Sequence, residues 1–124
     1  DYKGQSIVIS GDTVKLAKMV EMARGCDVLL HEAVNHNMVG MAKKSGLAGG
    51  DRLQAMAEEM LRYHTSTIEA AEIARDAGVK KLVLTHMVPG IPPNGVFERI
   101  FTRGMRKVYK GQIAVGRDGM EIKA

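Results

Sequence analysis

The sequence predicts a single α/β domain in which helices cover at least one face of a sheet. Its 124 residues are 45% hydrophobic and 26% charged, a balance typical of one globular domain. Short, continuously apolar segments alternate along the chain with segments whose apolar residues recur at helical spacing. Buried strands separated by helices are typical of layered folds whose strands are covered by helices.

The first part of the chain predicts two strands around one helix. Residues 6–10 form a β-rich segment that ends in a polar turn, and apolar residues then recur at helical spacing from Leu16 to Ala23. Asp27–His31 predicts a second, buried strand. We expect His36 and the Gly-rich segment Gly40–Gly50 to form a surface loop.

The middle of the chain predicts two helices and a third strand. One helix begins at Asp51 and carries an apolar face. A capping box formed by Ser66 and Glu69 opens the next helix, and Gly78 supplies the left-handed residue that ends it. Lys81–His86 is an apolar segment that predicts a third buried strand.

The last part predicts a helix and a closing hairpin. The loop Pro89–Pro93 excludes helix and central strand because its prolines lack the N–H donor. Asn94 is placed to cap a final helix. Gln112–Val115 and Met120–Ile122 are expected to pair as a hairpin, because Asp118–Gly119 supplies the positive φ values of a tight turn.

Composition excludes some classes of function. The net charge is +4, but Lys and Arg are scattered apart from Arg103–Lys110, and 4% aromatic residues with no Trp provide no platform for stacked bases. A dedicated nucleic-acid-binding module is therefore not favoured. No apolar run is long enough to span a membrane. Cys26 alone forms no internal disulfide, which agrees with a reducing compartment, and we expect a cytoplasmic location.

Polar residues follow each predicted strand. Asp12 follows the first strand, His31 and Glu32 end the second, His86 ends the third, and His64 precedes a helix. Ligands of α/β sheets bind at the carboxyl ends of strands, and carboxylate and imidazole groups serve metal binding and acid-base chemistry. Each residue alone has a structural alternative, such as capping a helix, so the hypothesis depends on their joint placement.

The order of these residues resembles one family, the metallo-β-lactamase-fold hydrolases, and within it the ribonuclease Z and arylsulfatase-like branch. Five segments carry the resemblance along nearly the whole chain. They are Ser10–Thr13 (Ser-Gly-Asp-Thr), Leu30–Ala33 (Leu-His-Glu-Ala), His64–Thr67 (His-Thr-Ser-Thr), Leu82–His86 and the closing segment Ile113–Ile122.

The resemblance implies that residues 1–124 form the C-terminal half of the αββα sandwich of this family, with one mixed sheet and helices on one face. The N-terminal half with its His-x-His-x-Asp-His motif is absent from the sequence. In the complete sandwich two sheets face each other, so this half exposes an apolar sheet face. We expect a homodimer or higher oligomer through that face, unless the N-terminal half is supplied in trans.

The resemblance also implies a divalent-metal hydrolase. Asp12 would bridge two metal ions and His86 would bind one of them, with zinc expected and manganese or iron as alternatives. The intact parent would hydrolyse an anionic phosphodiester or sulfate ester with a hydroxide bound by both metals. Two ligands leave the metal site incomplete, so we expect this chain alone to show little or no activity.

Further roles follow from the same resemblance. His64, oriented by Glu32, would protonate the leaving oxygen, and the N–H groups and hydroxyls of Ser66 and Thr67 would hold an anionic substrate oxygen. Residues 35–63 are longer than expected for tRNA-processing members, which favours relatives that act on small substrates. Two alternatives stay open: a non-catalytic interaction or assembly module, and a basic RNA-binding fragment.

Overall fold

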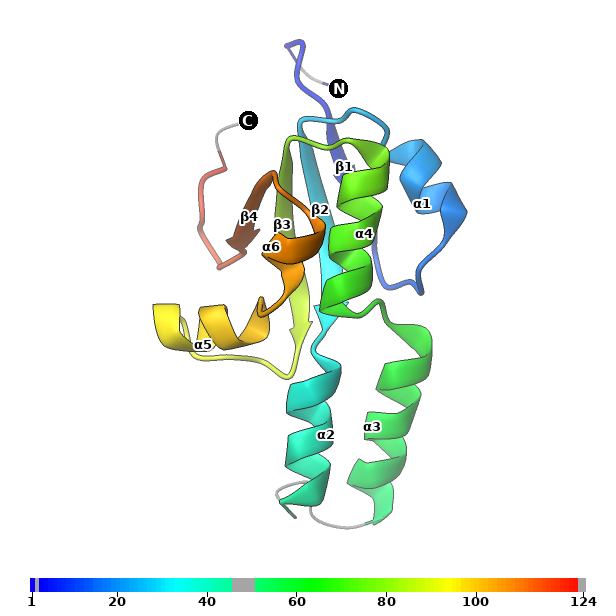
Figure 1. Ribbon diagram of the computed structural model, residues 1–124, viewed down its shortest axis with the longest axis vertical. Helices are drawn as coiled ribbons and strands as arrows, with labels where there is room; N and C mark the ends of the chain where they lie inside the picture. Colours follow the sequence, from blue (N-terminus) through cyan, green and yellow to red (C-terminus); the bar gives the residue numbers. More distant parts are fainter. Residues whose placement is uncertain (2, 46–50, 123–124) are drawn as a thin grey trace.

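Figure 1 shows the computed structural model of the chain, which describes residues 1, 3–45 and 51–122. Strands and helices alternate as expected for the α/β class. The elements are β1 (Ile7–Ile9), α1 (Ala17–Met22), β2 (Val28–Val34), α2 (His36–Lys44), α3 (Asp51–Tyr63), α4 (Thr67–Ala77), β3 (Lys81–Val88), α5 (Gly95–Phe101), α6 (Met105–Val108) and β4 (Gln112–Val115).

The four strands form one sheet in the order β1-β2-β3-β4. Each neighbouring pair is parallel, with Leu29 opposite Leu82 and Leu82 opposite Ile113 in register. The structure confirms the α/β class. The sheet was expected to be mixed, whereas all three strand pairs from β1 to β4 are parallel.

The predicted closing hairpin is also wrong, although its turn exists. The N–H of Met120 donates to the carbonyl of Arg117 at 3.0 Å, so the chain reverses where Asp118–Gly119 predicts it. Beyond the turn, Met120 and Ile122 line a hollow together with Leu30 and do not form a strand beside β4. The turn therefore forms as predicted, while the strand expected after it does not.

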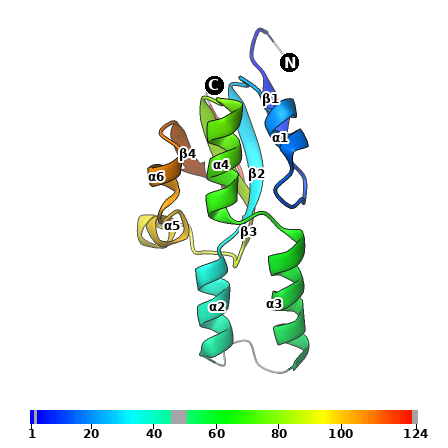
Figure 2. The ribbon, with the colours of Figure 1, turned by 45° about the vertical axis from the view of Figure 1, so that its right-hand side comes forward.

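Helices α1, α4 and α6 lie on one face of the sheet (Figures 1 and 2). This layer agrees with the expectation of helices on one face. Burial of a large apolar side chain here stabilises the fold by about 1.5–3 kcal/mol. The largest fully buried side chains of this core are Leu29, Ile73, Leu82, Leu84, Phe101 and Met105.

The opposite face of the sheet is less covered. Ile7 and Ile9 of β1 have relative exposures of 56% and 69%, while Val8 between them packs toward the core. Because side chains alternate along a strand, the two isoleucines share one face and Val8 lies on the other. The isoleucines thus form an exposed apolar edge.

Helix α4 begins and ends as the sequence predicts. The hydroxyl oxygen of Ser66 accepts from the Glu69 N–H, the Glu69 carboxylate accepts from the Ser66 N–H, and Gly78 ends the helix with a φ of 66°. The N–H of Val34 donates to the carbonyl of Thr65 at 2.8 Å. The segment before α4 is therefore fixed at the carboxyl end of β2.

Helix α2 forms where a loop was expected for His36. Asn35 caps it, because its side-chain oxygen accepts from the Met38 N–H at 3.0 Å. The side-chain amide of Asn35 also donates to the carbonyl of Phe101 at 2.8 Å, which holds the cap in place. Residues 46–50, part of the same expected loop, lie outside the described residues. Helices α2 and α3 extend side by side beyond the carboxyl ends of the strands (Figure 1). None of the described helices is long and apolar enough to cross a bilayer.

Candidate metal centre

The first candidate ligand, Asp12, follows β1 on a turn. The Ser10 N–H still donates to the carbonyl of Leu30 at 3.0 Å, which extends the pairing of β1 with β2 by one residue. Gly11 then adopts a φ of 62°, a conformation that glycine accepts without strain. This turn places Asp12 past the carboxyl end of the strand, with its side chain exposed.

His86 lies within β3, not after it, and occupies a β-bulge. Glu32 is opposite Thr85 and Ala33 is opposite Met87, so His86 has no counterpart on β2. Its φ is 42°, a left-handed conformation that strains a residue with a Cβ. Bulges of this kind redirect a side chain next to a functional site. The bulge lets Met87 pack toward the core while His86 stays exposed.

Asp12, His64 and His86 converge at the carboxyl ends of the strands. One ligand atom of each lies within 4.8 Å of the others. His86 Nε2 is 3.9 Å from an Asp12 carboxylate oxygen, and the His64 and His86 rings stack with centroids 5.7 Å apart and an interplanar angle of 15°. Two imidazoles and a carboxylate form a donor set that zinc accepts.

The spacing fits one divalent ion after a small adjustment. Ligand atoms about 2.0–2.2 Å from a tetrahedral zinc lie about 3.3 Å from one another. The side chains of Asp12 and His86 are 59% and 56% exposed, so rotamer changes can bring their atoms closer. The residues present therefore fit a metal ion.

Glu32 is buried beneath this cluster with a relative exposure of 1%. One carboxylate oxygen accepts from the Thr65 N–H at 2.7 Å and from the Thr13 N–H at 3.4 Å. The other oxygen lies 3.2 Å from His64 Nδ1. The Glu32 N–H donates to the hydroxyl of Ser10 at 3.2 Å. This single side chain therefore joins the turn that carries Asp12 to the segment that carries His64.

The contact between Glu32 and His64 is electrostatic. The two facing atoms are buried, have no hydrogen bond of good geometry, and contact no other polar partner among the described residues. A protonated imidazole would compensate the buried carboxylate. Since Nδ1 faces Glu32, Nε2 is the ring nitrogen left for substrate or metal.

Thr13 and Thr65 were not singled out by sequence reasoning. Besides their bonds to Glu32, the Thr65 hydroxyl donates to the carbonyl of Thr13 at 2.6 Å. Contacts through the backbone leave no residue-type pattern in a sequence. The signal available was their position, since each directly follows a candidate site residue.

His31 lies apart from the cluster. The predicted second strand ended at His31, but β2 continues to Val34 and encloses this imidazole completely. Its Nδ1 is 2.8 Å from the carbonyl of Glu32. Burial lowers the pKa of His31 from its ordinary 6.5, which keeps the ring neutral at pH 7.

Ser66 and Thr67 differ from their expected substrate role in one respect. The Ser66 N–H donates to the Glu69 carboxylate at 2.9 Å and is not free for a substrate oxygen. Thr67 is buried, with 5% relative exposure. The capping box explains this, because it satisfies the first N–H groups of α4 internally. The Ser66 hydroxyl proton is the group left for a substrate contact, and that role stays a prediction.

Curated relatives of the chain are ribonucleases. Ribonuclease Z of Mycobacterium sp. (strain KMS) is 38% identical over 93 residues, which cover 75% of this chain and 29% of that protein. The putative ribonuclease Z of Mycobacterium tuberculosis (strain CDC 1551 / Oshkosh) is 33% identical over 115 residues, covering 93% of this chain and 46% of that protein. The chain thus spans less than half the length of these relatives. No protein-family model matches it.

Solved structures share the fold. The metallo-beta-lactamase fold protein YhfI from Bacillus subtilis superposes with a TM-score of 0.61 at 21% identity, covering 94% of this chain and 39% of that one. A long form RNase Z from yeast gives a TM-score of 0.52 at 19% identity, covering 90% of this chain and 12% of that one. Motif order, fold and sequence similarity agree, and the chain belongs to the metallo-β-lactamase-fold hydrolases, in the group that includes ribonuclease Z.

Proposed function

We propose that this chain supplies part of a divalent-metal centre that hydrolyses phosphodiester bonds of RNA. The observation that carries the proposal is the convergence of Asp12, His64 and His86 over the buried carboxylate of Glu32. The names of the curated relatives, which are ribonucleases, support RNA as the substrate and a phosphodiester over a sulfate ester.

Each residue has a proposed role at the reacting phosphate. Asp12 and His86 would hold the ion, for which zinc is proposed because the donors are imidazole and carboxylate. A bound divalent ion supplies Lewis acidity, which polarises a phosphoryl oxygen and lowers the pKa of a water. His64 holds a proton at Nε2 for the leaving oxygen, and Glu32 stabilises the imidazolium from the Nδ1 side. The hydroxyl of Ser66 would donate to a phosphoryl oxygen.

Metal titration tests the ligand assignment. Zinc binding to this chain is measured calorimetrically for the wild type, Asp12→Asn and His86→Ala. We expect each variant to lose binding, because each removes one of few donors. Asp76→Asn and His36→Ala are matched controls, since both side chains lie outside the cluster and should leave binding unchanged. Equal zinc binding in all five proteins would contradict the proposed centre.

Hydrolysis tests the reaction. The complete gene product in which this chain occurs is assayed with bis(p-nitrophenyl) phosphate, an RNA oligonucleotide and an aryl sulfate. Turnover of the first two, lost in Asp12→Asn, is the expected result. Turnover of the sulfate alone would overturn the assignment to phosphodiesters. Full activity of Asp12→Asn would favour a non-catalytic assembly role for this part of the molecule.

The chain by itself should turn over little substrate. With His64 as proton donor, the chain supplies Asp12 and His86 as ligands, fewer than the three or four protein ligands that zinc takes. We further propose that it self-associates through the exposed face of Ile7 and Ile9, in a cytoplasmic setting. Light scattering at micromolar concentration would show a dimer or larger species. Ile9→Glu should shift it toward the monomer, and a wild-type monomer would contradict the proposal.

A further inference from the structure

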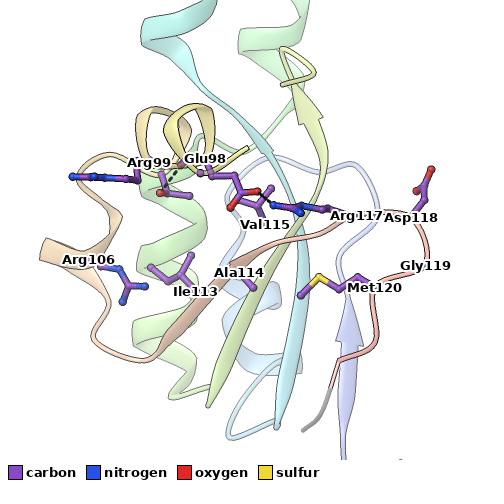
Figure 3. A pocket seen from close by; sticks show the side chains of 12 residues that line it. Glu98, Arg99, Arg106, Ile113, Ala114, Val115, Arg117, Asp118, Gly119 and Met120 are labelled. Carbon is purple, nitrogen blue, oxygen red and sulfur yellow. Dashed lines mark hydrogen bonds and ion pairs between the residues drawn. The ribbon is translucent and has the colours of Figure 1, made fainter. Parts of the chain in front are cut away.

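A hollow lies between α5, α6 and the turn after β4 (Figure 3). Its volume is about 770 Å³, and its lining includes Arg99, Arg106 and Arg117. We call this hollow the arginine pocket. Arg99 and Arg106 approach from the helical side, and Arg117 comes from the turn after the strand. Arginines from three separate elements thus line one space, with the Arg117 guanidinium turned toward Glu98 and the Arg99 guanidinium toward the outer side.

The charges of the arginine pocket favour an anion. Arg117 is paired with Glu98, and Asp118 adds a second carboxylate to the lining. Neither Arg99 nor Arg106 has an ion-pair partner within the part of the chain that the structure describes. Residues 99–110 contain five Lys and Arg side chains and no carboxylate. Guanidinium groups bind phosphate through paired N–H donors, so the two unpaired arginines suit a phosphate.

A second hollow includes one residue of the metal centre and shares part of its lining with the arginine pocket. Its lining includes Thr85 and His86 of β3 together with Arg117 and Met120. Arg117 and Met120 also line the arginine pocket, so the turn after β4 borders both hollows. A chain of phosphates that reaches His86 can therefore continue over this turn toward Arg99 and Arg106.

We infer that the arginine pocket binds a backbone phosphate of the RNA strand whose reacting phosphate lies at Asp12 and His86. The inference rests on the proposed function and extends it from one phosphate to a run of nucleotides. It also explains why the basic residues of α5 and α6 are concentrated beside the carboxyl-terminal strand. A substrate with a single phosphate would occupy the metal centre alone.

The experiment compares a long and a short substrate. The complete gene product and its Arg99→Ala/Arg106→Ala variant are titrated with a fluorescein-labelled RNA 12-mer at several salt concentrations, and KM is measured with bis(p-nitrophenyl) phosphate. We expect the variant to bind the 12-mer about tenfold more weakly. The slope of log affinity against log salt should fall by about 0.7 for each lost phosphate contact. KM for the small diester should not change.

Arg103→Ala is the control, because it removes one guanidinium group from the loop between α5 and α6 without lining the arginine pocket. Thermal unfolding verifies that all variants fold. Unchanged 12-mer affinity in the double variant, or an equal loss for Arg103→Ala, would overturn the inference. If the wild type hydrolyses neither substrate, the proposed function fails, while the binding data still decide whether the arginine pocket holds RNA.

Discussion

The imidazole of His64, one of the three residues of the candidate metal cluster, faces the buried carboxylate of Glu32 at 3.2 Å. Glu32 also accepts from the backbone N–H groups of Thr13 and Thr65. One buried charge therefore sets both the orientation of a ring and the separation of the two segments that border the site. Two substitutions can separate these tasks.

Glu32→Gln keeps an oxygen for the N–H donors but removes the charge. We expect unfolding free energy to change little and kcat to fall about 10–100-fold, as for other residues that orient a site. Glu32→Ala should in addition lower the unfolding free energy by about 1–3 kcal/mol, because buried N–H groups lose their acceptor. Urea unfolding and RNA hydrolysis measure the two effects. Exposed Glu121→Gln is the control, and equal kcat in Glu32→Gln and the wild type would refute the orienting role.

His64→Ala distinguishes a proton donor from a metal ligand. As a proton donor, His64 is dispensable for metal binding, so the variant should retain the ion while kcat falls about 100-fold or more. Metal content by mass spectrometry and hydrolysis rate are measured on the same preparation, beside His86→Ala as the ligand control. Loss of metal equal to that of His86→Ala would identify His64 as a third ligand instead.

Ser66→Ala tests the capping box of α4. Removing the hydroxyl acceptor of the Glu69 N–H should lower the unfolding free energy by about 1 kcal/mol, and Ser66→Gly should cost only a few tenths. Ser45→Ala serves as the control, because Ser45 is exposed and its hydroxyl donates to the Ala42 carbonyl. A higher KM for RNA in Ser66→Ala would support the substrate contact of this hydroxyl. An unchanged KM would restrict Ser66 to capping.

His31 makes stability depend on pH. Because burial holds its folded pKa below the ordinary 6.5, the unfolded chain binds more protons, and stability is lost as pH falls through about 6.5. Urea midpoints at pH 7.5 and 5.0 should differ, and His31→Gln should reduce the difference. The Lys80 ammonium lowers the pKa of Asp27 from 3.8 to about 2, so the stabilisation by that carboxylate is fully present over this range and is lost only in more acidic solution. A wild-type midpoint independent of pH over this range would contradict the prediction.

Local patterns predicted those parts of the fold that depend on neighbouring residues. The capping box of Ser66 and Glu69 and the ending at Gly78 place α4 correctly, because each interaction spans a few residues. Helix α2 was missed for a related reason. Its cap, Asn35, is held by the carbonyl of Phe101, a contact 66 residues away in the sequence, and Gly40 lowers the helical signal.

At the candidate site, too, the sequence predicted some features, and others depend on contacts between distant segments. Sequence order brought Asp12, His64, Glu32 and His86 into one hypothesis, and the structure places all four together. The bulge at His86 could not be predicted, because it exists only relative to the register of β2. The hairpin failed similarly, since a tight turn does not determine what the following residues contact.

His86, the extra residue of β3, interrupts the regular pairing with β2 and at the same time supplies a side chain to the candidate site. If His86 were deleted, Thr85 and Met87 would become consecutive and would still face Glu32 and Ala33, so regular pairing would be restored. We expect such a shortened protein to be as stable as the wild type or more stable, since a left-handed residue that costs about 1–3 kcal/mol is gone. Urea unfolding would measure this. Engineering that selects this chain for stability alone would therefore tend to remove His86, the residue proposed as a metal ligand.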